Sequence, residues 1–307
     1  STMTTAYFRI FSLVCSILIS SCEVVLDADF PEVDSALAVY TFLEPDQPIV
    51  VSVYASQSIA ESESQHEIVT DASVSILQSG TVVAVPILTV VSQDGLDATD
   101  VYRYVAAWPS NADLDEPFTI RVEAPGFDAV QATESVPARV IFDLVSASSV
   151  VIADPYLPEL SQSRVTLRFE LTDPPGDTYY FLMRRPSQNY GDPTFTVVDA
   201  PFKEPDPGES EGFDPGLFFS DVSFRSGTID FSIAYYTLPA ESDAFVLYSV
   251  SESYFEYDRT RQLQKDTNGN PFAEPAPIFT NIDGGYGVFA ASSRGWTEVV
   301  VAGASGE

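Results

Sequence analysis

The sequence predicts an all-β fold of two β-sandwich domains, with one short helix in the C-terminal domain. Apolar side chains recur at every second position in several segments, and clusters of Pro, Gly and Asp separate these segments. One stretch near residue 260 departs from this pattern. Alternation of period two is typical of strands with one buried and one solvated face. Many short strands at close spacing favour β-sandwiches.

The first element along the chain is a short apolar run. Residues 10–19 are apolar apart from two serines and a cysteine, and Arg9 precedes them. A ten-residue helix spans about 15 Å, which is roughly half of a bilayer core. The run therefore predicts a signal peptide, residues 1–21, and not a transmembrane helix.

Cys22 follows directly on this segment. The preceding residues, Ile19, Ser20 and Ser21, place an aliphatic residue three positions before the cysteine and small residues next to it. This order resembles a bacterial lipobox, so we expect cleavage before Cys22 and lipid attachment at its sulfur. An ordinary secretory signal with an incidental cysteine, or a buried N-terminal strand, is the alternative. Residues 22–34 would form an acidic tether.

A domain boundary is predicted near residue 137. Residues 35–138 contain about seven strand candidates, the size of one immunoglobulin-like or transthyretin-like sandwich. Residues 139–307 are predicted to form a second, mostly β domain. Segment 189–215, rich in Pro, Gly, Asp and Glu, is predicted to be a long exposed loop within it.

Three segments show the strand alternation most clearly. Their inward side chains are expected to be Phe118, Ile120 and Val122; Val165, Leu167, Phe169 and Leu171; and Ile229, Phe231, Ile233 and Tyr235. Residues 78–81 fit a hairpin tip, and the Pro-Gly pair within 124–127 fits a type II turn. The tyrosine pairs 179–180 and 235–236 should each place one ring inside and one outside.

One helix is predicted over residues 252–265. Ser253 and Glu256 have the spacing of a capping box, good helix formers follow, and Asn268-Gly269 would end the helix. Three aromatic side chains on it are expected to pack on the second domain: Tyr254, Phe255 and Tyr257.

The charge of the chain is strongly acidic. It has 45 acidic and 14 basic residues, a net charge of −31. Such a field repels phosphate backbones, which argues against nucleic-acid binding. High salt shortens the Debye length to about 3 Å at 1 M, so we interpret the charge first as a halophilic adaptation. A cation-binding or partner-steering surface is the alternative.

Catalytic signatures are scarce. The single histidine, His66, lies in a polar stretch and has no cysteine partner. No phosphate-binding or dinucleotide fingerprint occurs. Residues 266–277 faintly resemble a calcium loop, but Pro271 and Pro277 occupy positions that require Gly and Glu. We therefore predict no catalytic residue, no cofactor and no metal site, although a chance pair of carboxylates could support hydrolysis.

The most specific string is QLQKDTNGNPFAEPAPIFTNIDGGYGVFAAS, residues 262–292. Together with SCEVVLDAD at 21–29 and VSVYAS at 51–56, it resembles the domain-of-unknown-function 4249 family of lipoproteins from Bacteroidota and their relatives. The resemblance implies an outer-membrane lipoprotein, on the periplasmic or cell-surface side, often encoded beside a TonB-dependent transporter. It implies no known reaction.

This string also supplies the candidate contact residues. Its Asn-Pro and Glu-Pro steps favour extended or turn backbone on both sides of an aromatic residue, and its glycines allow close backbone approach before a final strand. It serves either as structural closure of the second sandwich or as a ligand or partner contact. The candidate contacts are Asn270, Phe272, Glu274, Asn281, Gly285 and Tyr286.

The predicted function is that of a non-enzymatic, lipid-anchored outer-membrane protein. It would capture substrate for a TonB-dependent transporter or act as an accessory to it. A structural or adhesive cell-surface protein, or a carboxylate-based hydrolase, is the alternative.

Overall fold

The computed structural model describes residues 35–56, 67–92, 100–152, 162–176, 178–186, 196–199, 216–221, 227–237, 242–267 and 276–302. The strands of the N-terminal half are β1 (Leu37–Leu43), β2 (Ile49–Ala55), β3 (Ser73–Gln78), β4 (Thr81–Ala84), β5 (Ile87–Ser92), β6 (Asp100–Ala106), β7 (Phe118–Glu123) and β8 (Val130–Glu134). The later elements are β9 (Ile141–Ile152), β10 (Gln162–Thr172), β11 (Tyr179–Pro186), β12 (Thr196–Asp199), β13 (Gly216–Ser220), β14 (Thr228–Thr237), β15 (Ser242–Val250), α2 (Glu252–Thr267) and β16 (Tyr286–Ala302).

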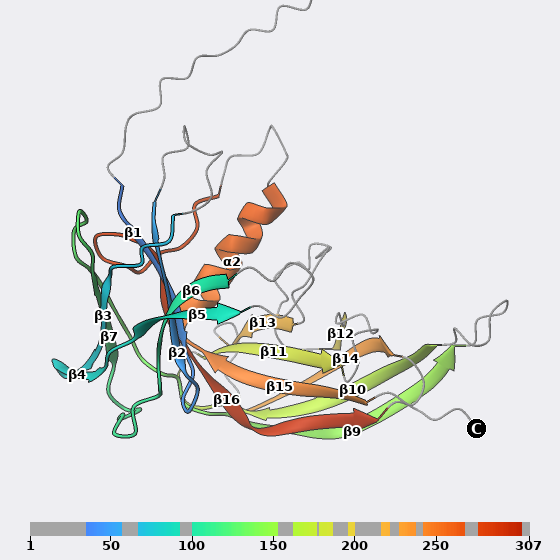
Figure 1. The fold of residues 1–307 in the computed structure, drawn as a ribbon. Helices are drawn as coiled ribbons and strands as arrows, with labels where there is room; N and C mark the ends of the chain where they lie inside the picture. The colour runs from blue at the N-terminus through green and yellow to red at the C-terminus, as the bar shows by residue number, and fades with distance from the viewer. Residues whose placement is uncertain are drawn as a thin grey trace, which may run out of the picture.

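The described elements form three sheets and one helix (Figure 1). The largest sheet has the order β13-β11-β15-β16-β1-β2-β6-β5, and the two smaller ones have the orders β12-β14-β10-β9 and β4-β3-β7-β8. The prediction of an all-β, sandwich-type fold with one short helix is confirmed. The predicted signal peptide, Cys22 and the tether lie outside the described residues.

The first and last strands of the chain lie side by side. β16 runs parallel to β1, from Tyr286 opposite Ala38 to Ala291 opposite Leu43. Its C-terminal part then pairs antiparallel with β15, and Figure 1 shows this long, curved strand running from beside β1 to beside β15. One continuous sheet therefore spans both halves of the molecule.

Two apolar cores lie along this sheet. The first draws on residues from Leu37 to Val136, and Ile282, Phe289 and Ala291 also belong to it. The second draws on residues from Val140 to Leu247. Whether residues 35–138 and 139–307 are separate domains stays a prediction.

The predicted inward faces of the strands are confirmed. Every inward residue predicted in β7, β10 and β14 is at most 2% exposed. Because alternation puts neighbouring residues on opposite faces, Tyr235 is buried while Tyr236 is 48% exposed. Both predicted turns are also present. Ser79 and Gly80 have positive φ at the β3–β4 tip, and Gly126 has φ 84° between β7 and β8.

The predicted helix is present, but its N-terminal cap is not the predicted one. α2 begins at Glu252, and the N–H of Tyr254 donates to Ser251 Oγ at 3.3 Å. The N–H of Ser251 also donates to the carbonyl of Ala291 at 2.8 Å. The cap lies two residues before the predicted Ser253, because this contact with β16 fixes where the chain turns into the helix.

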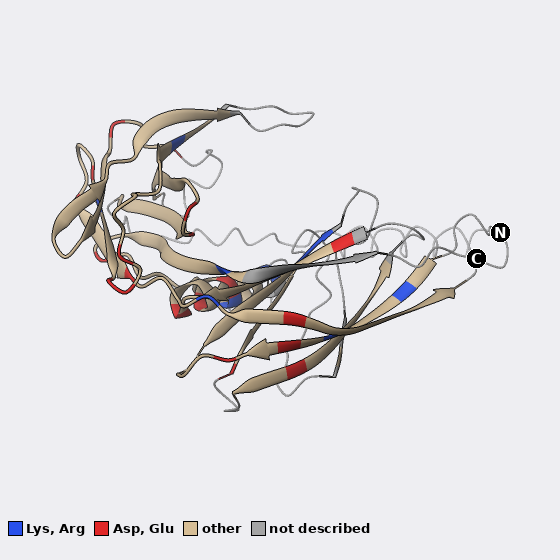
Figure 2. Cartoon of the chain, turned by 90° about the horizontal axis from the view of Figure 1, so that it is seen from below, with Lys and Arg blue, Asp and Glu red and all other residues tan. Residues whose placement is uncertain are grey.

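Acidic residues are scattered over the surface, and three of them form a row across one sheet (Figure 2). Glu170 on β10 lies opposite Asp143 on β9 and Asp230 on β14. All three are exposed, and Arg168 contacts Asp230 at 3.1 Å. Like charges directly opposite each other destabilise a sheet, so this row costs stability at low ionic strength.

Candidate functional site

Aromatic side chains gather on the face of the large sheet that carries α2. In β1 the alternation buries Val39 and Thr41 and turns Tyr40 and Phe42 to the opposite face. Tyr54 of β2 lies on that same face, with its ring 6.2 Å from the ring of Tyr40. The strand pattern alone therefore produces an aromatic surface on the side away from the first core.

The helix α2 adds rings of its own to this surface. The ring of Tyr254 lies 4.8 Å from that of Phe42, and the ring of Tyr257 lies 5.9 Å from Phe42 and 6.2 Å from Tyr40. Phe255 instead packs on Tyr179 of β11 at 5.0 Å. The ring of Tyr254 also lies 5.6 Å from that of Phe218 on β13, so Tyr254 and Phe255 contact the second half as expected. Tyr254 and Tyr257 in addition contact β1, because the continuous sheet brings β1 within reach of the helix.

A groove opens along β1 and β2 on this face. It has a volume of about 460 Å³ and is open to solvent. Its lining combines rings, short apolar side chains and polar groups: Tyr40, Thr41, Phe42, Glu44, Gln47, Pro48, Val50 and Ser52. Phe42 and Val50 are exposed although they are apolar. An apolar lining with a few polar groups is what small-ligand sites present.

Glu44 is the carboxylate of the groove. Partial burial raises its pKa, and the nearby charges of Arg294 and Arg139 oppose that shift. Arg139 also makes an ion pair with Asp46 at 3.2 Å. The two arginines therefore favour an ionised Glu44, able to accept hydrogen bonds from a ligand at this end of the groove.

The two tyrosine hydroxyls beside the groove stay protonated at neutral pH. Burial is the main cause that raises the pKa of Tyr40, and also that of Tyr257. Each phenol can therefore donate as well as accept a hydrogen bond. The site offers ring faces, hydroxyls, one amide and one carboxylate.

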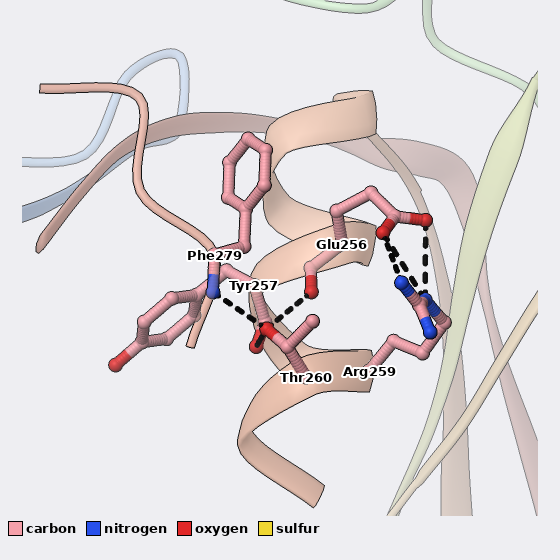
Figure 3. Close-up of polar contacts among 5 residues, drawn as sticks. All are labelled: Glu256, Tyr257, Arg259, Thr260 and Phe279. Carbon is pink, nitrogen blue, oxygen red and sulfur yellow. Dashed lines mark hydrogen bonds and ion pairs between the residues drawn. The ribbon is translucent and has the colours of Figure 1, made fainter. Parts of the chain in front are cut away.

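The helix is held in place beside the groove by its own polar contacts (Figure 3). The hydroxyl of Thr260 donates to the carbonyl of Glu256 at 2.8 Å and accepts from the N–H of Phe279 at 2.9 Å. Arg259 pairs with the Glu256 carboxylate at 2.6 Å on the solvent side. The Thr260 contact ties the chain after α2 back to the helix, which carries Tyr257 beside the rings of Tyr40 and Phe42.

The candidate contact residues that the structure describes, Asn281, Gly285 and Tyr286, are not part of the groove lining. Asn281 accepts from the N–H of Phe289 at 2.9 Å and donates to its carbonyl at 2.7 Å. A Cβ on Gly285 would approach the carbonyl oxygen of Leu37 to 2.4 Å. These two residues therefore have structural tasks, while the Tyr286 side chain is 47% exposed. Asn270, Phe272, Glu274 and the proposed lipid site Cys22 lie outside the described residues.

Sequence reasoning missed the groove residues themselves. The segment LAVYTFL of β1 has the required alternation, with aromatic residues at the positions that face away from the core. That signal was available in the sequence. The position of α2 over β1 was not, because it depends on the pairing of β1 with β16.

Two carboxylates converge in the second half, outside the groove. Tyr180 donates to Asp173, and the N–H of Thr178 donates to Asp221 at 2.6 Å. Burial raises the pKa of Asp221 to about 6. The hydrogen bond from Thr178 opposes this shift, and the nearby Asp173 adds to it. Asp221 is only 3% exposed, so this cluster ties β11 to the end of β13 and leaves little of the carboxylate for a substrate to reach.

A buried ion pair lies deeper in the same half. Arg184 and Asp243 are at most 1% exposed and 3.3 Å apart. The guanidinium carbon lies 4.1 Å from the centre of the Tyr235 ring, and the same group donates to the carbonyl of Tyr236 at 3.1 Å. The carbonyl of Tyr236, the ring of Tyr235 and the carboxylate of Asp243 together compensate for the cost of burying the Arg184 guanidinium. This cluster links the two layers of the second core.

Within the described ranges, no three of the His, Cys, Asp and Glu side chains gather in a way that could hold a metal ion. None of the helical segments that the structure describes is both long enough and apolar enough to cross a membrane.

Comparison with models of known protein families assigns the chain to one family. A family model described as Domain of unknown function (DUF4249) matches residues 23–297. The chain belongs to this family. The match extends over β1 to the greater part of β16, so the groove and both cores are parts of the DUF4249 region. No curated protein matches the chain.

Proposed function

We propose that this DUF4249 protein is a non-enzymatic lipoprotein of Bacteroidota, anchored in the outer membrane through Cys22. It captures substrate for a TonB-dependent transporter or covers the mouth of that transporter as an accessory. The observation that carries the proposal is the open aromatic groove beside α2. The order Ile19-Ser20-Ser21-Cys22 supports the lipid anchor.

The groove chemistry favours binding over catalysis. Hydrolysis by carboxylates requires two of them on either side of the scissile bond, and Glu44 is the single carboxylate in the described groove lining. The half-buried ring of Tyr40 and the exposed ring of Phe42 can stack on the flat apolar face of a ligand, and Gln47 and Ser52 can hydrogen-bond its polar edge. A ligand with one apolar face and hydroxyl or amide groups at its rim fits this arrangement.

The surface charge is consistent with an exposed position in a saline environment. A net charge of −31 keeps a protein soluble, and salt screens its self-repulsion. This supports the halophilic interpretation of the composition.

Purification from native membranes tests the proposal. The tagged full-length protein is extracted in mild detergent, and co-purifying proteins are identified by mass spectrometry beside a Cys22→Ala control. We expect an outer-membrane barrel with the wild type, and a mass increase at Cys22 that the control lacks. Recovery of a lipidated protein alone, in several detergents and salts, would favour a structural or adhesive surface protein instead.

A further inference from the structure

Strand β5 forms one edge of the eight-stranded sheet. It pairs along its length with β6, from Ile87 opposite Val105 to Ser92 opposite Asp100. On its other side, the described part of the chain contributes no strand to the sheet. An edge strand presents a row of N–H and C=O groups that can pair with a further strand.

The side chains of β5 are apolar and exposed on both faces of the sheet. Ile87 and Val91 are 66% and 39% exposed on the face of the groove. Leu88 and Val90 are 37% and 48% exposed on the opposite face. A strand added to this edge would bury apolar surface on both sides as well as pair the backbone.

The described strand β5 itself carries none of the usual devices that protect an edge strand. Residues 81–92 contain no Asp, Glu, Lys or Arg, although the whole chain has 45 acidic and 14 basic residues. The register between β5 and β6 runs without a bulge, and Pro86 precedes the strand and does not interrupt it. Charges, bulges and prolines are the features that prevent edge-to-edge pairing.

We propose that β5 is a self-association edge, on which β5 of a second copy of this chain adds in antiparallel orientation around a twofold axis. The two eight-stranded sheets would then form one continuous sheet. This proposal goes beyond the binding function above and does not depend on it.

Charge favours a second copy as the occupant. Twofold pairing brings the same patch of the two copies together, so an acidic patch on the strand would face an acidic patch. Two chains of charge −31 repel each other least where they meet through a patch without carboxylates, and residues 81–92 are such a patch. A basic partner would instead be attracted by acidic side chains at the interface, and β5 has none.

Cysteine cross-linking of the full-length protein in its own membranes tests the pairing. Thr89→Cys and Val90→Cys are made separately, because a twofold axis at the middle of β5 places one of these positions next to its counterpart. Opposite residues in an antiparallel pair lie about 4.5–5.5 Å apart, within disulfide range. Mild oxidation and non-reducing electrophoresis should give a species of twice the mass from at least one variant.

Two controls keep the test specific. The unsubstituted protein and Val198→Cys, a residue on β12 that is 53% exposed, should give no such species. A Val90→Lys variant should lower the mass of the detergent-solubilised protein from dimer to monomer in analytical ultracentrifugation. Failure of both edge cysteines to cross-link, with a monomer at every concentration, would overturn the proposal. Cross-linked species of another mass would also overturn it, by identifying a foreign strand as the occupant.

Discussion

The Asn281 side chain holds Phe289 by both of its backbone polar groups, at 2.9 Å and 2.7 Å. At Phe289, strand β16 is paired with β1 on one side only. On the other side, β15 pairs with β16 only from Ser292 onward. Ser251 makes the equivalent contacts with Ala291, the residue two positions further. A side-chain amide and a serine thus replace the strand that is missing here, so that buried backbone groups stay hydrogen-bonded.

Replacing Asn281 by Ala should therefore lower stability. The change leaves the N–H and C=O of the buried Phe289 without these partners, and the free energy of unfolding should fall by about 3 kcal/mol. Urea denaturation followed by circular dichroism measures this. Tyr286→Ala, at a neighbouring exposed position, should cost less than about 1 kcal/mol. Equal losses in the two variants would contradict a structural task for Asn281.

Gly287→Ala should separate β1 from β16. Gly287 has φ 100°, and a Cβ there would lie 2.0 Å from the carbonyl oxygen of Val39. Backbone strain and this clash should cost about 3 kcal/mol or more. Gly80→Ala is the matched control, with φ 76° and nothing within 4 Å of the added atom, and should cost about 1 kcal/mol. Thermal unfolding of both variants checks the difference, and similar melting temperatures would argue against close pairing at Gly287.

Stability should depend on pH through Asp221. Its pKa is raised from 3.8 to about 6 in the folded protein, so between these values the folded state binds more protons than the unfolded state. This contribution is fully present below pH 4 and is lost as pH rises through 6, by up to about 3 kcal/mol. Asp221→Asn should gain stability relative to the wild type as the pH rises from 4 to 7.5. A difference between the two proteins that stays constant with pH would refute this assignment.

The acidic row on β9, β10 and β14 should make stability depend on salt. Glu170→Gln removes the central charge between Asp143 and Asp230 and should raise the free energy of unfolding by about 0.5 kcal/mol at low ionic strength. The gain should shrink at 1 M salt, where the Debye length is about 3 Å. Glu123→Gln should give no such gain, because Glu123 pairs with Arg121 at 2.5 Å. An unchanged gain at high salt would exclude charge repulsion as its cause.

The sequence was sufficient to predict the strands with clear alternation and their buried faces, but β12 (Thr196–Asp199) lies within segment 189–215, which was predicted to be a loop. Period-two alternation is a local property, and Phe169 and Ile233 occupy the inward positions expected of them. The hairpin tip at Gly80 and the turn at Gly126 follow from local backbone preferences in the same way.

The groove could not be predicted in this way, because long-range pairing creates it. Nothing local to Tyr257 indicates that it will lie 6.2 Å from Tyr40, more than two hundred residues earlier in the chain. The parallel pairing of β1 and β16 brings them together. Asn281 was singled out as a contact residue because the string around it is distinctive, yet its hydrogen bonds are to the chain's own backbone.

Site-specific photo-cross-linking from the groove in living cells tests the central claim most directly. A photoreactive phenylalanine analogue replaces Phe42 in the groove, or Tyr236, an exposed aromatic residue on β14 outside the groove lining. The account predicts that irradiation joins the position-42 protein to one outer-membrane barrel and that the position-236 protein gives no such product. The same products from both positions, or no barrel from position 42, would contradict a role for this groove beside a transporter.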